Sequence, residues 1–229
     1  MYKNTNFDNN LVEGVVSFMN NFLLATLLCF SFMFSPSTLN LDSKVYSKLG
    51  EILNIEEYGM KIAYFLEGSI KEELDYIKSK SYFKNSSWDI KEREAYLKID
   101  EKNISLEISL IEEEKNLRGE IVINSKGRIN IEEIKKNFHL FHNKNIENMN
   151  FYTYIKGDIR ENNNIDEIEG KILEAIGKDK VKEKQSISLD KGTTGIINLK
   201  SDYQFNYSIM TYEKGRKLII GTPIIFTTY

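Results

Sequence analysis

Alternation of apolar and polar residues in the middle of the chain predicts antiparallel β-strands. In residues 104–110, Ile, Leu, Ile and Leu alternate with Ser, Glu and Ser, a pattern typical of a strand with one buried and one wet face. Residues 95–99 alternate in the same way, and a third strand is expected at residues 117–124, after an acidic turn at residues 112–114. These three segments are therefore expected to be neighbours in one antiparallel sheet.

Two helices and one strand are expected before these strands. The first helix covers residues 40–54, and a strand follows at residues 59–66. The second helix begins at Ser69, where Glu72 completes a capping box in which each side chain satisfies the other residue's backbone N–H. Apolar residues at helical spacing form one stripe on each helix; these are Leu41, Val45, Leu49 and Ile52 on the first, and Ile70, Leu74 and Ile77 on the second.

The same order of elements recurs in the second half of the chain. Asn130 and Asn164 each begin a helix and are followed three residues later by Glu133 and Glu167. Gly177 ends the second of these helices. The apolar stripes are Ile131, Ile134, Phe138 and Phe141, and then Ile165, Ile168, Ile172 and Ile176. Strands are expected at residues 149–159, 181–189, 195–199, 203–212 and 217–226, with a hairpin turn at residues 213–216.

This recurrence predicts an α+β fold built from two pseudo-repeats, residues 38–128 and 129–229. Each repeat runs helix, strand, helix and then antiparallel strands. Together they would form one curved antiparallel sheet with helices on one face. The alternative is a chance succession of ordinary helices and strands, because few residues are identical between the halves.

An uncharged segment at residues 22–34 predicts export. Its length suits the apolar core of a signal peptide better than a membrane span, and Ser35 and Ser37 supply small residues for cleavage after Ser37. Residues 1–37 are therefore expected to be a signal peptide, with Met1 or Met19 as the start. The alternatives are an uncleaved anchor at residues 15–34 and a buried core helix.

The composition limits the chemistry of the domain at residues 38–229. The single cysteine, Cys29, lies in the apolar segment, so no disulfide or thiolate site is expected in the domain. The whole chain has a formal net charge of −3, and this acidic balance disfavours nucleic acid as a partner, because phosphate binding depends on a surplus of Lys and Arg.

Motifs with catalytic or metal-binding potential are few. His139 and His142 are the only histidines. They could share a helix face, but nothing identifies a third metal ligand. The loop at residues 191–195, Lys-Gly-Thr-Thr-Gly, lacks the phosphate-loop pattern and is expected to be a hairpin turn. We therefore expect no metal, no cofactor and no enzymatic activity.

Aromatic residues offer the one candidate binding surface. Tyr203, Phe205 and Tyr207 alternate with Gln204, Asn206 and Ser208 on one expected strand, and Phe151, Tyr152 and Tyr154 lie on an earlier one. Such rings stack on bases, sugars or apolar peptides. They also fill ordinary hydrophobic cores, and the sequence leaves both interpretations open.

The end of the chain resembles a known family. Residues 205–229 are FNYSIMTYEKGRKLIIGTPIIFTTY. This run resembles the C-terminus of the YwmB family of endospore-forming Gram-positive bacteria, whose chains close on an Asn-containing strand, a Tyr, a short turn, G-T-P-I-I and an acidic–Tyr pair. Asn206, Tyr212, residues 221–225 and Tyr229 match that pattern, whereas Thr228 stands where the family has Glu.

The resemblance implies an exported domain with a fold similar to that of TATA-box-binding protein, a saddle of two repeats, and a link to sporulation. It implies no catalytic or ligand-binding residue. Together with the apolar segment, it leads us to expect a secreted or membrane-anchored cell-envelope domain, not an enzyme, that binds a protein or a glycan through its sheet surface. The alternatives are a nucleic-acid-binding saddle and an uncharacterised envelope enzyme, because fold does not determine function.

Overall fold

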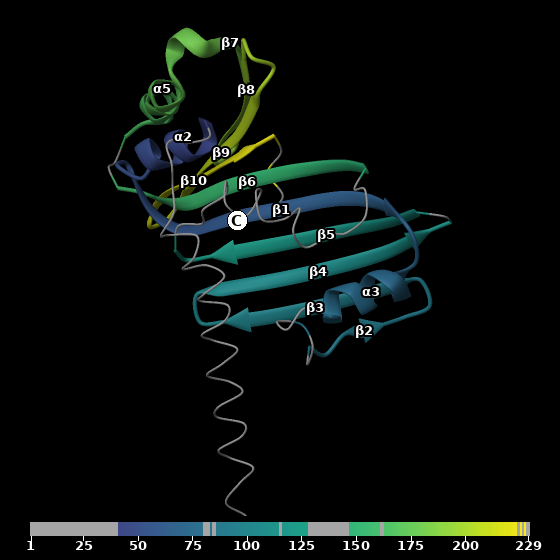
Figure 1. Cartoon of the computed structure of the whole chain (residues 1–229). Coiled ribbons are helices and arrows are strands. Elements are labelled where there is room, and N and C mark those ends of the chain that lie inside the picture. Colours follow the sequence, from purple (N-terminus) through teal and green to yellow (C-terminus); the bar gives the residue numbers. More distant parts are fainter. Residues whose placement is uncertain are drawn as a thin grey trace, which may run out of the picture.

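The structure is a computed structural model that describes residues 41–79, 83, 86–114, 116–127, 147–160, 163–223, 225 and 227. One large antiparallel sheet of ten strands dominates it, and a few helices accompany the sheet, so the fold is α+β (Figure 1). The strands follow the order β2-β3-β4-β5-β1-β6-β10-β9-β8-β7. The middle of the sheet is therefore formed by β1 and β6, which are separated in the sequence by the whole β2–β5 segment.

The first half of the described chain contributes two helices and five strands. They are α2 (Leu41–Leu49), β1 (Leu53–Glu67), α3 (Ile70–Ser79), β2 (Asp89–Ile90), β3 (Glu94–Glu101), β4 (Ile104–Glu113) and β5 (Asn116–Ser125). The second half contributes β6 (Glu147–Ile159), α5 (Ile165–Ile176), a short 3-10 helix (Lys178–Lys180), β7 (Val181–Leu189), β8 (Gly192–Leu199), β9 (Gln204–Tyr212) and β10 (Gly215–Thr222). Figure 1 shows that the β7–β10 end of the sheet is strongly turned relative to the β3–β5 end.

All three described α-helices contact the same side of the sheet, which we call the inner face. Tyr46 of α2 hydrogen-bonds Thr153 of β6, Glu73 of α3 accepts a bond from Tyr64 of β1, and Glu169 of α5 accepts one from Tyr207 of β9. The cross-strand register places these three strand residues on one side. The inner face carries the core; its fully buried members include Met60, Ile62, Leu97, Leu110, Leu117, Ile155, Phe205, Leu218 and Ile220.

The predicted strand pattern is confirmed by burial. Leu106, Ile108 and Leu110 are buried on β4, while the residues between them are partly exposed. Both described capping boxes are also present: Ser69 and Glu72 exchange hydrogen bonds at α3, and Asn164 and Glu167 do so at α5. These local signals place the helix starts correctly because each box satisfies backbone N–H groups that have no partner inside the helix.

Several predicted boundaries differ from the structure, among them the start of β8, which lies at Gly192 instead of residue 195. The first helix ends at Leu49 instead of residue 54, and β1 begins at Leu53 instead of residue 59. A register shift between Ile55 and Glu57 interrupts the alternation in β1, which hides the start of the strand. The last strand ends at Thr222, because Pro223 has no backbone N–H to continue the ladder. The predicted helix at residues 130–141 and the apolar segment at residues 22–34 lie outside the described residues.

Candidate functional site on the outer sheet face

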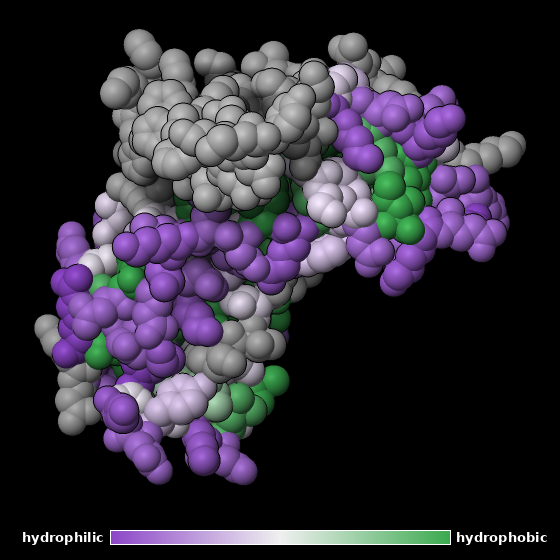
Figure 2. Space-filling view, turned by 90° about the horizontal axis from the view of Figure 1, so that it is seen from below, coloured by the Kyte–Doolittle hydropathy of each residue, from purple (hydrophilic) through white to green (hydrophobic). Residues whose placement is uncertain are grey.

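The opposite side of the sheet, which we call the outer face, carries many polar side chains together with a few apolar ones, such as Val122 and the buried Ile219. It is formed by alternate residues of the strands, which the register places side by side; its central members are Glu57, Gly59 and Lys61 of β1, Glu120 and Asn124 of β5, Tyr152 and Tyr154 of β6, and Lys217 and Gly221 of β10. Most of these side chains are partly exposed, unlike those of the inner face. In the view from below, toward the β2–β3 edge of the sheet, hydrophilic side chains alternate with several hydrophobic patches (Figure 2).

Tyr154 lies at the centre of the outer face between two glycines. Gly59 of β1 and Gly221 of β10 are its direct cross-strand partners. A Cβ atom added at Gly59 would lie 1.9 Å from the Tyr154 ring, so only glycine leaves room for this ring. Tyr154 is 1% exposed although it belongs to the polar face.

Two polar side chains hold the Tyr154 hydroxyl. It lies 2.5 Å from Glu57 Oε1, to which it donates, and 3.0 Å from Asn124 Oδ1. Burial of the phenol, and next its bond to the Glu57 carboxylate, raise the pKa of Tyr154 well above its usual value. The Tyr154 hydroxyl thus serves as the hydrogen-bond donor to the Glu57 carboxylate.

The segment after β10 turns back along this face. The Asn206 side-chain amide donates to the Pro223 carbonyl oxygen, and Thr227 interacts with the Tyr154 hydroxyl. A Cβ atom at Gly221 would lie 3.3 Å from Ile225 Cγ1. Of the C-terminal motif, Asn206, Gly221, Pro223 and Ile225 thus lie near the centre of the outer face, beside Tyr154.

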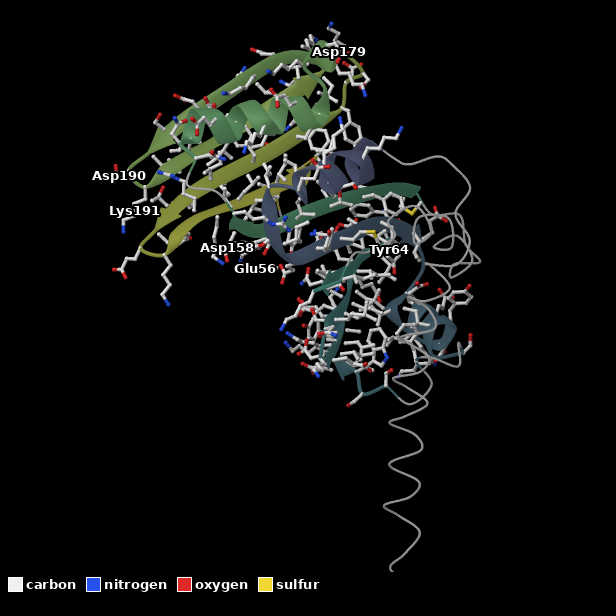
Figure 3. The ribbon with its side chains drawn as sticks, turned by 90° about the vertical axis from the view of Figure 1, so that its left-hand side faces the viewer. Glu56, Tyr64, Asp158, Asp179, Asp190 and Lys191 are labelled. Atoms are coloured by element: carbon white, nitrogen blue, oxygen red, sulfur yellow. The ribbon has the colours of Figure 1, made fainter. Side chains whose placement is uncertain are left out.

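The basic side chains of the outer face are paired with carboxylates. Lys61 Nζ lies 2.9 Å from Glu120 Oε2 and 6.0 Å from the centre of the Tyr152 ring. The other pairs are Lys98 with Glu107 and Asp100, Arg118 with Glu113, and Lys217 with Glu56 and Asp158. Figure 3 shows Glu56 and Asp158 close together at one end of β1 and β6. These pairs cancel the positive charge that a phosphate ligand would need.

Of the aromatic residues nominated from the sequence, Tyr203, Phe205, Tyr207 and Phe151 lie on or against the inner face, whereas Tyr152 and Tyr154 lie on the outer face. Phe205 and Tyr207 are fully buried, and Tyr203 packs edge-on against Phe205 at 5.5 Å between ring centres. Their alternation with Gln204, Asn206 and Ser208 is as predicted. A ligand on the sheet surface cannot reach Phe205 or Tyr207 in this structure, so burial favours the core-filling interpretation of these rings.

Tyr207 has a further role that its alternation with polar residues did not indicate. Its hydroxyl donates to Glu169 Oε1 of α5 at 2.5 Å, and the other oxygen of Glu169 pairs with Lys184 of β7. Burial, and then the Glu169 carboxylate, raise the pKa of Tyr207 well above its usual value. The arrangement joins α5 to the sheet through a buried carboxylate.

Sequence reasoning did not find the Tyr154 site, because Glu57, Asn124 and Thr227 are far from Tyr154 along the chain. The usable signal was the pair of glycines inside strands, Gly59 and Gly221, since such glycines mark a close approach of another group. The hairpin turn predicted at residues 191–195 is shorter in the structure: Asp190 and Lys191 form the turn, and residues 192–195 belong to β8. His139 and His142 lie outside the described residues.

The described residues hold neither a metal cluster nor a membrane-spanning helix. No group of three or more His, Cys, Asp or Glu side chains is placed to hold a metal ion in the part of the chain that the structure describes. Among the same residues, no helix is long and apolar enough to cross a membrane. Comparison with known protein families and with curated proteins finds no match for this chain.

Proposed function

We propose that the chain is a non-enzymatic binding domain of the cell envelope whose ligand, a protein or a glycan, contacts the outer face. The observation that carries this proposal is the separation of the two sheet faces. The described helices pack on the inner face, whereas the outer face presents tyrosines, ion pairs and polar side chains to solvent. Such a surface suits a polar ligand, since tyrosine combines an apolar ring with a hydrogen-bonding hydroxyl.

Export remains part of the proposal and rests on the apolar segment at residues 22–34. A signal peptide or anchor there would place the sheet outside the cytoplasm. The resemblance to the YwmB family, with its link to sporulation, belongs to the same proposal. It rests on the C-terminal motif, of which Gly221, Pro223 and Ile225 lie at the centre of the outer face.

We also propose that the two halves are pseudo-repeats in a saddle similar to that of TATA-box-binding protein. The strand order supports this. Counted outward from the boundary between β1 and β6, the order is β1-β5-β4-β3-β2 in the first half and β6-β10-β9-β8-β7 in the second. In each half, the first strand therefore lies beside the last strand of that half, and the remaining strands follow in reverse order of sequence. A helix follows the first strand in both halves, α3 after β1 and α5 after β6.

Nucleic-acid binding is the second candidate, since a saddle of this kind would present the outer face to its ligand. The ion pairs of Lys61, Lys98, Arg118 and Lys217 count against it, because each cation is already neutralised by a carboxylate.

An envelope enzyme has less support still. The buried carboxylates Glu73 and Glu169 accept hydrogen bonds from tyrosines on the inner face, away from solvent.

A double variant, Lys61→Ala with Tyr152→Ala, tests the role of the outer face. It removes the contact of Lys61 with the Tyr152 ring from a partly exposed surface, so folding should be little affected. We expect retention of ligand from solubilised envelope extract or purified cell-wall glycan to fall at least about tenfold, as for the loss of a binding hot spot. The measurement is quantitative pull-down with the full chain.

Lys102→Ala is the matched control, because Lys102 is an exposed lysine in the β3–β4 turn. It should retain ligand as the unaltered chain does. If the double variant retained as much ligand as the unaltered chain, the proposal would be contradicted. Retention on duplex DNA that falls steeply with salt would instead support the nucleic-acid candidate.

A further inference from the structure

The strand β7 forms a long free edge of the sheet. It pairs with β8 on one side and stands last in the strand order. At the opposite edge, β2 comprises only the two residues Asp89–Ile90. A nine-residue edge strand offers a row of backbone N–H and C=O groups to another strand, whereas a very short one does not. Among the described strands, β7 is therefore the edge at which the sheet can be extended.

The two halves of β7 differ in how well charged side chains protect the edge against pairing with another strand. Lys182, Glu183 and Lys184 in its first half are charged, as is usual for an edge that avoids pairing. Its second half carries no charge, and Ile187 and Leu189 are 67% and 45% exposed. Ile187 pairs with Thr194 on the outer-face side of the sheet. Exposed apolar side chains on an uncharged edge indicate a strand that is covered by a partner.

We propose that β7 pairs antiparallel with β7 of a second copy of this chain, with the two-fold axis at Ile187. Directly opposite residues then share a face of the joined sheet. Ile187 meets Ile187 of the second copy, and Leu189 lies opposite Gln185. The exposed apolar side chains of both copies are thereby brought together on the outer-face side.

Charge complementarity supports this register. With the axis at Ile187, Glu183 lies opposite Lys191 of the second copy, and Lys184 lies opposite Asp190. Both contacts occur twice because of the symmetry. Asp190 and Lys191 are exposed at the tip of the β7–β8 hairpin, where their side chains are free to reach a neighbouring strand (Figure 3). Opposite charges facing each other across strands stabilise a pair, and like charges destabilise it.

Neighbouring registers lose these contacts. With the axis at Ser186, Lys182 would meet Asp190, but Leu189 would face Glu183, an apolar side chain against a charge. With the axis at Ser188, Ile187 would face Leu189, but Lys191 would face Gln185 and no opposite charges would meet. Only the register at Ile187 places apolar residues in the centre and complementary charges at both ends. The paired sheets would then carry their two outer faces on the same side.

Charge reversal tests the proposal in the full chain with Cys29→Ser. We expect Glu183→Lys and Lys191→Glu each to raise the dimer dissociation constant roughly tenfold, because each creates two like-charge contacts. The double variant Glu183→Lys with Lys191→Glu should recover the original constant. Sedimentation velocity under one set of solvent conditions measures all four proteins. Unchanged constants for the single variants, or a monomer at every concentration, would overturn the proposal.

Single cysteines test the register independently. Facing residues of an antiparallel pair have Cα atoms about 4.5–5.5 Å apart, which suits a disulfide. In the Cys29→Ser background, Ile187→Cys should form an intermolecular disulfide under mild oxidation, and Ser188→Cys should not. Both positions are exposed, so neither change should affect folding. Cross-linking of Ser188→Cys alone, or of neither variant, would overturn the register at Ile187.

Discussion

Glu169→Ala is expected to destabilise the domain by about 3 kcal/mol, because it breaks a buried hydrogen bond and a partly buried ion pair together. Glu169 is 8% exposed and accepts the Tyr207 hydroxyl through one oxygen while the other pairs with Lys184. Its removal leaves a buried phenol without its acceptor and Lys184 without its carboxylate, and both losses cost free energy. For a domain of this size the melting temperature should fall by roughly 10 °C.

Two further variants on α5 show whether burial is the cause. Glu169→Gln keeps an oxygen that can accept from Tyr207 but loses the ion pair, so it should cost less than half as much as Glu169→Ala. Glu174→Ala removes an exposed carboxylate from the same helix, whose pair with Lys178 is worth less than about 0.5 kcal/mol. Equal melting temperatures for Glu169→Ala and Glu174→Ala would show that the buried contact does not hold α5 to the sheet.

Gly59→Val is expected to cost about 3 kcal/mol, the effect of overpacking a closely fitted site. Strand propensity alone predicts the opposite, because valine is favoured over glycine in strands. The added Cβ atom would lie 1.9 Å from the Tyr154 ring. The ring could move only by breaking the hydroxyl contacts with Glu57 and Asn124. Chemical denaturation of the two proteins measures the difference.

Gly170→Ala provides the control for this change. Gly170 lies within α5, and a Cβ atom there meets nothing within 4 Å. Alanine should therefore stabilise the helix by about 0.5–1 kcal/mol. If the Tyr154 ring causes the loss at Gly59, the effects of Gly59→Val and Tyr154→Ala will be non-additive. Additive effects, or a stable Gly59→Val protein, would mean that the ring does not occupy the space over Gly59.

Local features of this fold could be predicted because neighbouring residues determine them. The alternation of apolar and polar residues in β4 indicates that one face of the strand is buried. The capping box of Asn164 and Glu167 depends only on two residues that are three positions apart. The sheet order could not be predicted, since β1 pairs with β5 and β6 through contacts distant in sequence. The start of β1 was missed because its register shift breaks the period-two pattern on which prediction depends.

The distinction between the two faces explains why alternation alone could not decide between a binding surface and a core for Tyr203, Phe205 and Tyr207. Alternation separates Tyr203, Phe205 and Tyr207 from Gln204, Asn206 and Ser208, but it does not say which set the helices cover. Apolar area decides this, because burying large rings removes more surface from water than burying amides. The aromatic set accordingly lies in or against the core, and the amide of Asn206 faces the segment after β10.

The central claim is that the outer face meets its ligand outside the cytoplasm, and cell fractionation with N-terminal sequencing of the native protein tests it most directly. We expect the protein in the extracytoplasmic fraction with an N-terminus at Thr38, or in the membrane fraction if the apolar segment is retained. A cytoplasmic protein that begins at Met1 or Met19 would contradict the claim.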